Sequence, residues 1–155
     1  MRALAAAPGS LEALLLKSDV LAVQQRHDDA EKTLRAAIAA APKQPAPRFA
    51  LIVHLLRRGA LDKAALESAA MEQAVPQYPM TFYAKAMVLT EEKNYPAARQ
   101  AILQVLKAAP EHVPSLTLAG MAALQTGALI EAESHLRKAV FSAPQATGAK
   151  RLLAA

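Results

Sequence analysis

The chain contains no cysteine and no tryptophan among its 155 residues. The absence of cysteine excludes disulfide bonds, thiolate metal sites and cysteine nucleophiles, but it does not fix the compartment. Other aromatic residues are scarce, and the apolar fraction of 54% is carried largely by alanine and leucine. Because sheets are rich in aromatic and β-branched residues, this composition predicts an all-α protein with closely packed helices.

The sequence also lacks a long apolar run and a dense basic cluster. A short apolar stretch at the N-terminus is interrupted by Pro8 and Gly9, so we expect no direct membrane span. The formal net charge is +5, but the densest basic pairs, at 57–58 and 150–151, lie far apart in the sequence. We therefore expect no nucleic-acid partner, because a dedicated basic patch is missing.

What the sequence does contain is a regular ladder of prolines. Five of its ten prolines recur every 34 residues, at Pro8, Pro42, Pro76, Pro110 and Pro144. A fixed period of this size indicates an array of helical hairpins rather than a closed globule. The predicted repeats are 11–44, 45–78, 79–112 and 113–146, with partial helices at 1–7 and 147–155.

Each repeat is expected to hold two helices, A and B, of about fourteen residues each. In the first three repeats the expected helices are 11–24 and 28–41, 46–58 and 62–75, and 80–92 followed by a B helix from Pro96. Gly59 and Gly127 supply turns between A and B. A small residue is expected where A crosses B most closely. Ser18, Ala86 and Gly120 fit, whereas Ile52 and Ser68 make the second repeat the least regular.

These repeats resemble the tetratricopeptide repeat (TPR). The resemblance rests on small residues at the eighth, twentieth and twenty-seventh positions of the unit and proline at the thirty-second, and it covers essentially the whole chain. It implies a right-handed superhelical array of antiparallel helix hairpins. It also implies a single TPR domain over 1–155 that acts as a non-enzymatic protein-interaction scaffold and is part of a longer array.

Three local stretches are similar to a narrower group, the long TPR lipoproteins encoded beside bacterial exosortase (PEP-CTERM) and exopolysaccharide loci. The stretches are LKAAPEHVPSLTLAG, AESHLRKAVFSAP and AKRLLA. This resemblance implies a periplasmic or outer-membrane-associated protein that serves exopolysaccharide export or protein sorting, although such proteins carry an N-terminal lipidated cysteine that this sequence lacks. A fragment of this kind would end in apolar Leu152 and Leu153, so we expect partial self-association through its ends.

The TPR resemblance further implies that the A helices line a concave groove. The candidate protein-binding residues carried over onto this groove are Leu15, Phe49, Val53, Tyr83, Met87, Thr117 and Met121, and Asp19 and Ala22 lie on the same face. The Lys, Asn and Arg residues with which some TPR proteins clamp the C-terminal carboxylate of chaperones are absent from the corresponding positions. A co-chaperone role is therefore not expected.

Two interpretations of this groove stay open. In one, it is an adaptable apolar trough for an extended peptide or an amphipathic helix, and Arg48, Arg57 and Lys85 steer an acidic partner. In the other, its apolar residues pack between neighbouring A helices, and the chain is a structural spacer with no groove ligand. A basic helical-repeat RNA binder is a further alternative, but no polar pair recurs in each repeat to support it.

No pattern in the sequence predicts catalysis or metal binding. The histidines are His27, His54, His112 and His135. They occupy four different positions within their repeats, whereas metal ligands must converge from one face. No serine is paired with a base, and the glycines form no phosphate-binding loop. We therefore expect no enzyme activity, metal or cofactor, and we interpret the histidines as solvated or partly buried.

Overall fold

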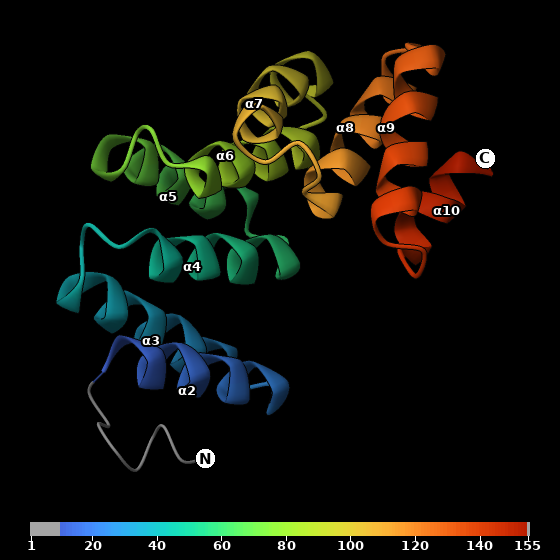
Figure 1. Ribbon diagram of the computed structural model, residues 1–155. Coiled ribbons are helices and arrows are strands. Elements are labelled where there is room, and N and C mark those ends of the chain that lie inside the picture. Colours follow the sequence, from blue (N-terminus) through green and yellow to red (C-terminus); the bar gives the residue numbers. More distant parts are fainter. Residues whose placement is uncertain (1–9, 155) are drawn as a thin grey trace. The chain divides into compact units, whose positions relative to one another are not determined.

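The computed structural model describes residues 10–154, whose regular structure is entirely α-helical (Figure 1). The helices are α2 (Leu11–Val23), α3 (His27–Ala40), α4 (Pro45–Arg57), α5 (Leu61–Ala74), α6 (Pro79–Glu91), α7 (Tyr95–Ala108), α8 (Val113–Gln125), α9 (Leu129–Ser142) and α10 (Thr147–Leu153). The all-α class is confirmed. The partial helix expected at 1–7 lies outside the described residues.

The A and B helices alternate with the period of the proline ladder. Helices α2, α4, α6 and α8 begin 34 residues apart, and so do α3, α5, α7 and α9. Most of them begin one residue earlier than expected, as α4 does at Pro45 and α5 at Leu61. Proline is compatible with the first helical position because the N–H that it lacks has no partner within the helix there.

Every A-to-B turn contains one residue in the left-handed backbone region. Glycine fills this place in two turns, where Gly59 and Gly127 have φ of 69° and 73°. Gln25 and Lys93 fill it in the other two, with φ of 61° and 60°. The residue that follows donates its N–H to a carbonyl in the last turn of helix A, as Arg26 does to Leu21 at 2.9 Å. This bond satisfies a carbonyl at the helix end, so the turn is closed in the same way in all four repeats.

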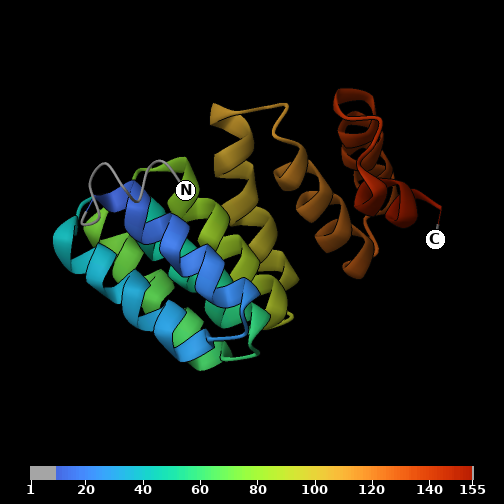
Figure 2. The same cartoon turned by 90° about the horizontal axis from the view of Figure 1, so that it is seen from below.

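The chain forms two compact units, Met1–Thr81 and Phe82–Ala155. In the first unit α2 packs on α3, α4 packs on both α3 and α5, and α2 also touches α4. Figure 2 shows α2 and α3, in blue and light blue, lying side by side. The largest buried side chains of this unit belong to α4 and α5, and they include Leu51, Ile52, Leu55 and Met71, all at most 1% exposed.

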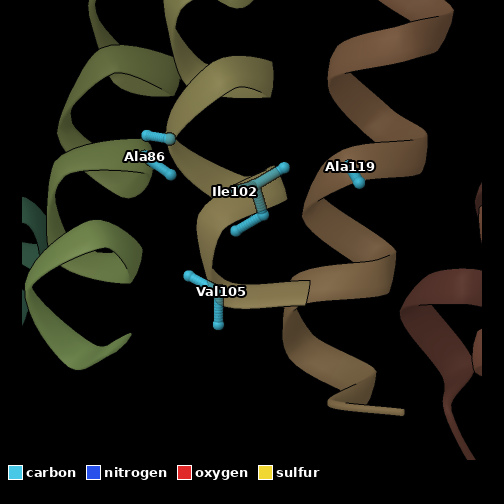
Figure 3. Close-up of a cluster of buried hydrophobic side chains, with 5 residues drawn as sticks. Ala86, Ile102, Val105 and Ala119 are labelled. Carbon is cyan, nitrogen blue, oxygen red and sulfur yellow. The ribbon is translucent and has the colours of Figure 1, made fainter. Parts of the chain in front are cut away.

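The second unit contains two buried apolar clusters. In the first, Ile102 and Val105 of α7 lie between Ala86 of α6 and Ala119 of α8 (Figure 3). The second cluster joins α8, α9 and α10 through Leu116, Leu136, Ala139 and Ala149, and Leu152 packs against it. The small residues in these clusters allow the helix backbones to approach closely, which agrees with the alanine-rich composition.

The expected close approach of A to B is clearest at Gly120. A Cβ atom at this position would lie 2.5 Å from Cγ of Leu136, so no side chain fits without movement of the leucine. Ser18 and Ala86, at the equivalent positions, are also buried. In the second repeat the sizes are reversed, because Ile52 takes the place of the small residue and Ser68 that of the large one. Both are buried, so the irregularity seen in the sequence is a compensated exchange of volume.

Candidate functional site

Two adjoining hollows lie between α2 and α4 in the first unit, and together we call them the α2–α4 cleft. One hollow, of about 190 Å³, is lined chiefly by α2 and by the middle of α4, and we call it the apolar hollow. The other, of about 560 Å³, lies at the end of α4 and the start of α3, and we call it the basic hollow. They share Asp19, Ala22, His54 and Arg57, so the cleft is continuous.

The apolar hollow contains two of the three candidate residues predicted in this unit. Phe49 and Val53, one helical turn apart on α4, both line it, opposite Asp19 and Ala22 of α2. Leu15, the third candidate, is not among the lining residues. Its backbone carbonyl accepts a hydrogen bond of 2.6 Å from the Ser18 hydroxyl, in the wall of the same cleft.

The basic hollow is built around a pair of histidines. The ring centroids of His27 and His54 lie 5.7 Å apart, with an angle of 51° between the ring planes. Nε2 of His27 donates to Oε1 of Gln25 at 3.1 Å, because a carbonyl oxygen can only accept. His54 is only 8% exposed. Nδ1 of His27 and Nε2 of His54 are buried and have no hydrogen-bond partner among the described residues.

The surroundings of His54 favour its neutral form. Burial lowers the pKa of His54, and the nearby His27 and Arg58 side chains lower it further. The backbone of His27 and the carboxylate of Glu31 act in the opposite direction, but the balance leaves the pKa below its ordinary value of 6.5. At neutral pH His54 therefore adds no charge to the basic hollow, whereas Arg57 and Arg58 are charged.

Two arginines border the basic hollow, and their circumstances differ. Arg58 donates to Asp28 at 3.0 Å, but the Asp28 side chain is 86% exposed, so solvent screens this pair. Arg57 has no ion pair within residues 10–154. The one acidic side chain that lines both hollows is Asp19, on α2. Among the residues that line the cleft, two arginines face one acidic side chain, which makes the cleft suited to an anionic group.

Arg48, expected to steer an acidic partner, does not serve the cleft. It donates to Glu67 of α5 at 2.9 Å, and it is not among the residues that line the cleft. Glu67 also accepts from Arg35 at 2.9 Å, and Arg35 binds Glu31 on its own helix at the same distance. Hydrogen bonds to Glu31 and Glu67 raise the pKa of Arg35. Arg48 thus belongs to a network that ties α3, α4 and α5 together.

The candidate residues of the second unit are partly buried. Tyr83 packs against the cluster around Ile102, and its ring stands edge-on to His112 at 5.5 Å between centroids and an angle of 86°. Burial raises the pKa of Tyr83. The Thr117 hydroxyl donates to the Val113 carbonyl of its own helix at 2.9 Å. Met87 and Met121 are likewise partly buried. Tyr83 therefore has a packing role whether or not it contacts a ligand.

A shallow hollow at the start of α9 was not expected from the sequence. It has a volume of about 770 Å³, and its lining includes Leu129, Ile130 and His135. Leu129 and Ile130 are 65% and 88% exposed. Its ionisable lining residues are Glu131 and His135, and its large exposed side chains are apolar.

Sequence reasoning also missed the pairing of His27 with His54. The two lie in different repeats and at different positions of the unit, so comparing equivalent positions does not bring them together. Other residues occupy the equivalent positions in the other repeats. Position 27 corresponds to Leu61 and Tyr95, and position 54 corresponds to Val88 and Ala122. The histidine pair thus stands where other repeats carry mainly apolar side chains.

Neither a metal centre nor a membrane span is found in the part of the chain that the structure describes. Residues 10–154 contain no group of three His, Asp or Glu side chains placed to hold a metal ion. None of the described helices combines the length and the apolar character needed to cross a bilayer.

Comparisons with known proteins identify the repeat. The sequence matches the tetratricopeptide repeat family over residues 2–45, 29–79 and 83–147. Among curated proteins, none matches it significantly. The fold is similar to that of TTC0263, a thermophilic TPR protein of Thermus thermophilus, with a TM-score of 0.81 and 21% identity over 99% of this chain and 84% of that chain.

Two further solved structures have the same fold. MamA from Desulfovibrio magneticus RS-1 gives a TM-score of 0.74 with 21% identity over 92% of this chain and 81% of its own. YrrB, a TPR protein with an unusual peptide-binding site, gives a TM-score of 0.70 with 17% identity over 96% of this chain and 77% of its own. The resemblance first noted in the proline ladder is confirmed, and the chain belongs to the tetratricopeptide repeat family.

Proposed function

We propose that this chain is a protein-interaction scaffold whose α2–α4 cleft binds an extended peptide or an amphipathic helix. The observation that carries the proposal is the position of Phe49 and Val53. They lie one turn apart in a continuous cleft between two A helices, where apolar anchors of a partner would fit. An interaction role agrees with the family, since TPR proteins bind protein or peptide partners, and YrrB, of the same fold, has a peptide-binding site.

The second unit has a less direct part in this proposal. Met87, Thr117 and Met121 are partly buried side chains on A helices, and methionine adapts readily to differently shaped ligands. Tyr83 favours the spacer interpretation for its own position, because it already packs against the buried cluster around Ile102. We therefore assign the peptide contacts first to Phe49 and Val53.

A role in the cell envelope is a further part of the proposal. Its support is the local similarity of residues 106–120 and 132–144 to TPR lipoproteins of exosortase and exopolysaccharide loci. The location of the gene tests this part independently of any binding measurement. A gene far from such loci, in a reading frame without an N-terminal lipidation cysteine, would contradict it.

Selection from a displayed peptide library tests the binding role. Peptides of about twelve residues are long enough to span a groove of this kind. We expect peptides enriched on the wild type to lose affinity for Phe49→Ala/Val53→Ala, because the double variant removes the two large apolar side chains of the α4 wall. The loss per hot-spot side chain is expected to be about 2 kcal/mol.

The matched control is Leu66→Ala. Leu66 is 72% exposed on α5 and does not line the cleft, so this variant removes a large apolar side chain elsewhere in the same unit. Circular dichroism verifies that each variant is folded at the temperature used. Selected peptides that bind the double variant as tightly as the wild type would refute the assignment of the cleft and favour the spacer interpretation.

A further inference from the structure

The histidine pair that lines the basic hollow has two ring nitrogens without hydrogen-bond partners among the described residues. These are Nδ1 of His27 and Nε2 of His54, both buried, and a buried polar group without a hydrogen bond is costly. The equivalent positions elsewhere in the chain hold mainly apolar residues, including Val88 and Ala122, both buried. The repeat fold therefore does not require histidine here, and a ligand that satisfies both nitrogens offsets the cost.

The hydrogen bonds of the pair restrict which ligand does so. Because Nε2 of His27 donates to Gln25, the neutral ring presents only a lone pair at Nδ1. This nitrogen becomes a donor only when the ring is protonated. Arg57, which lines the same hollow, is a donor at all pH values of interest. A carboxylate is an acceptor without protons of its own. It complements Arg57 at any of these pH values, and it complements a ring of the histidine pair once that ring has gained a proton.

We propose that the basic hollow bounded by His27, His54 and Arg57 binds an Asp or Glu side chain of the partner peptide and takes up a proton as it does so. This proposal rests on the proposed function, because the basic hollow continues into the apolar hollow through Ala22 and His54. A peptide whose apolar side chains contact Phe49 and Val53 places a neighbouring acidic side chain beside Arg57.

The charged groups around the histidine pair determine whether protonation of a ring and binding of a carboxylate are favoured. From α4, Arg58 disfavours a protonated His54, and both Arg57 and Arg58 attract a carboxylate. From α3, Glu31 favours the protonated form, and Asp28 is paired with Arg58. From α2, Asp19 favours a protonated imidazole but repels a carboxylate. Helix α5 contributes no side chain to the lining.

The test uses two blocked peptides that differ only in a central Glu or Gln between flanking leucines. Binding to the full chain is measured by calorimetry at about pH 7.5 and about pH 5.5, on either side of the ordinary histidine pKa. We expect the Glu peptide to bind about tenfold more tightly at the lower pH, as uptake of one proton allows, and the Gln peptide to show little dependence on pH. Measurements in buffers of different ionisation enthalpy report the proton uptake directly.

Three variants distinguish a direct contribution of these residues to carboxylate binding from a merely structural role. Arg57→Gln, at an exposed site, is expected to weaken binding of the Glu peptide and to leave the Gln peptide unaffected. His54→Val, which introduces the residue found at position 88, is expected to reduce the pH dependence. Asp19→Asn removes a repelling charge and is expected to strengthen binding of the Glu peptide. Equal effects of Arg57→Gln and Asp19→Asn on both peptides would contradict the proposed contact.

Acetate provides a probe that does not depend on peptide binding. We expect the titration midpoint of the His54 ring resonances, and hence the pKa of His54, to rise when acetate replaces chloride at equal ionic strength. If neither peptide binds, the proposed function fails, and the acetate titration alone decides whether the hollow accepts a carboxylate. If both peptides bind equally at both pH values, the proposed function stands and this proposal is overturned.

One more peptide identifies the source of the carboxylate. It carries the central Gln and a free C-terminus, so its only carboxylate is terminal. We expect it to bind like the blocked Gln peptide. Binding as tight as that of the Glu peptide, with the same dependence on pH, would overturn the assignment to an acidic side chain.

Discussion

At His54, folding moves an imidazole out of water, and burial lowers its pKa below the ordinary value of 6.5. The unfolded chain therefore binds a proton at this site at a higher pH than the folded chain does. The contribution of His54 to the free energy of unfolding is complete above about pH 6.5 and is lost as the pH falls toward the folded-state pKa.

We therefore expect the melting temperature of the wild type to fall more steeply between about pH 7.5 and about pH 5.5 than that of His54→Val. Thermal denaturation followed by circular dichroism measures both slopes. The variant retains every other titratable group, so the difference between the slopes isolates His54. If the melting temperatures of the two proteins fell in parallel with pH, the pKa of His54 would not differ between the folded and the unfolded chain, which contradicts this prediction.

A second residue-scale prediction concerns the left-handed turn position. Lys93 has φ of 60°, which is unfavourable for a side chain with a Cβ atom, whereas glycine adopts it freely. Lys93→Gly is expected to raise the free energy of unfolding in urea by about 0.5–1 kcal/mol. Gly59→Ala is the reverse control. No atom lies within 4 Å of its added Cβ, so any loss of stability comes from backbone strain.

At the scale of the helix pair, the contact of α8 with α9 depends on Gly120. The Cβ of Gly120→Ala would lie 2.5 Å from Cγ and 2.6 Å from Cδ2 of Leu136. We expect this variant to lower the free energy of unfolding by about 1–3 kcal/mol, because overpacking displaces the leucine or the helix. Chemical denaturation measures the change.

Gly148→Ala is the matched control for this prediction. Gly148 also lies in a helix, but its added Cβ would meet only Cγ2 of Thr117, at 3.9 Å, which is an ordinary contact. We expect it to be neutral or stabilising, since alanine favours the helix by up to about 1 kcal/mol over glycine. A Gly120→Ala variant as stable as Gly148→Ala, relative to the wild type, would contradict a tight approach to Leu136.

The helices were predictable because each relies on a signal within its own segment. Proline marks the linkers, and alanine at positions such as Ala98 and Ala132 marks the buried face of helix B. Lysine itself gives no local signal for the left-handed conformation of Lys93, because glycine is that signal. Only the register, 34 residues after Gly59, indicates this conformation. Ile52 and Ser68 were noticed as irregular, but only their joint burial indicates that they compensate.

The candidate site was predictable in part for the same reason. Phe49 and Val53 lie at fixed positions of helix A, so the repeat register alone assigned them to the groove face, and both line the α2–α4 cleft. The basic hollow depends on a contact between α3 and α4, which belong to different repeats. His27 and His54 meet there although they are 27 residues apart and share no position of the unit.

For the whole molecule, the proposed peptide site lies in the first compact unit and does not extend over both. The cleft that contains Phe49 and Val53 lies within Met1–Thr81. The shallow hollow at the start of α9, which contains Leu129 and Ile130, lies within Phe82–Ala155. The α2–α4 cleft and the hollow at α9 are therefore alternative binding sites for the peptide, and a single experiment distinguishes them.

A methyl-labelled NMR titration of the full chain with a peptide selected on the wild type locates the proposed peptide site. We expect shifts at Val53 and Ala22, which line the cleft, to saturate with the affinity found by calorimetry, while the methyl groups of Ile130 and Leu129 stay unchanged. Shifts confined to Ile130 and Leu129, with Val53 and Ala22 unaffected at saturation, would contradict the assignment of the α2–α4 cleft as the peptide site.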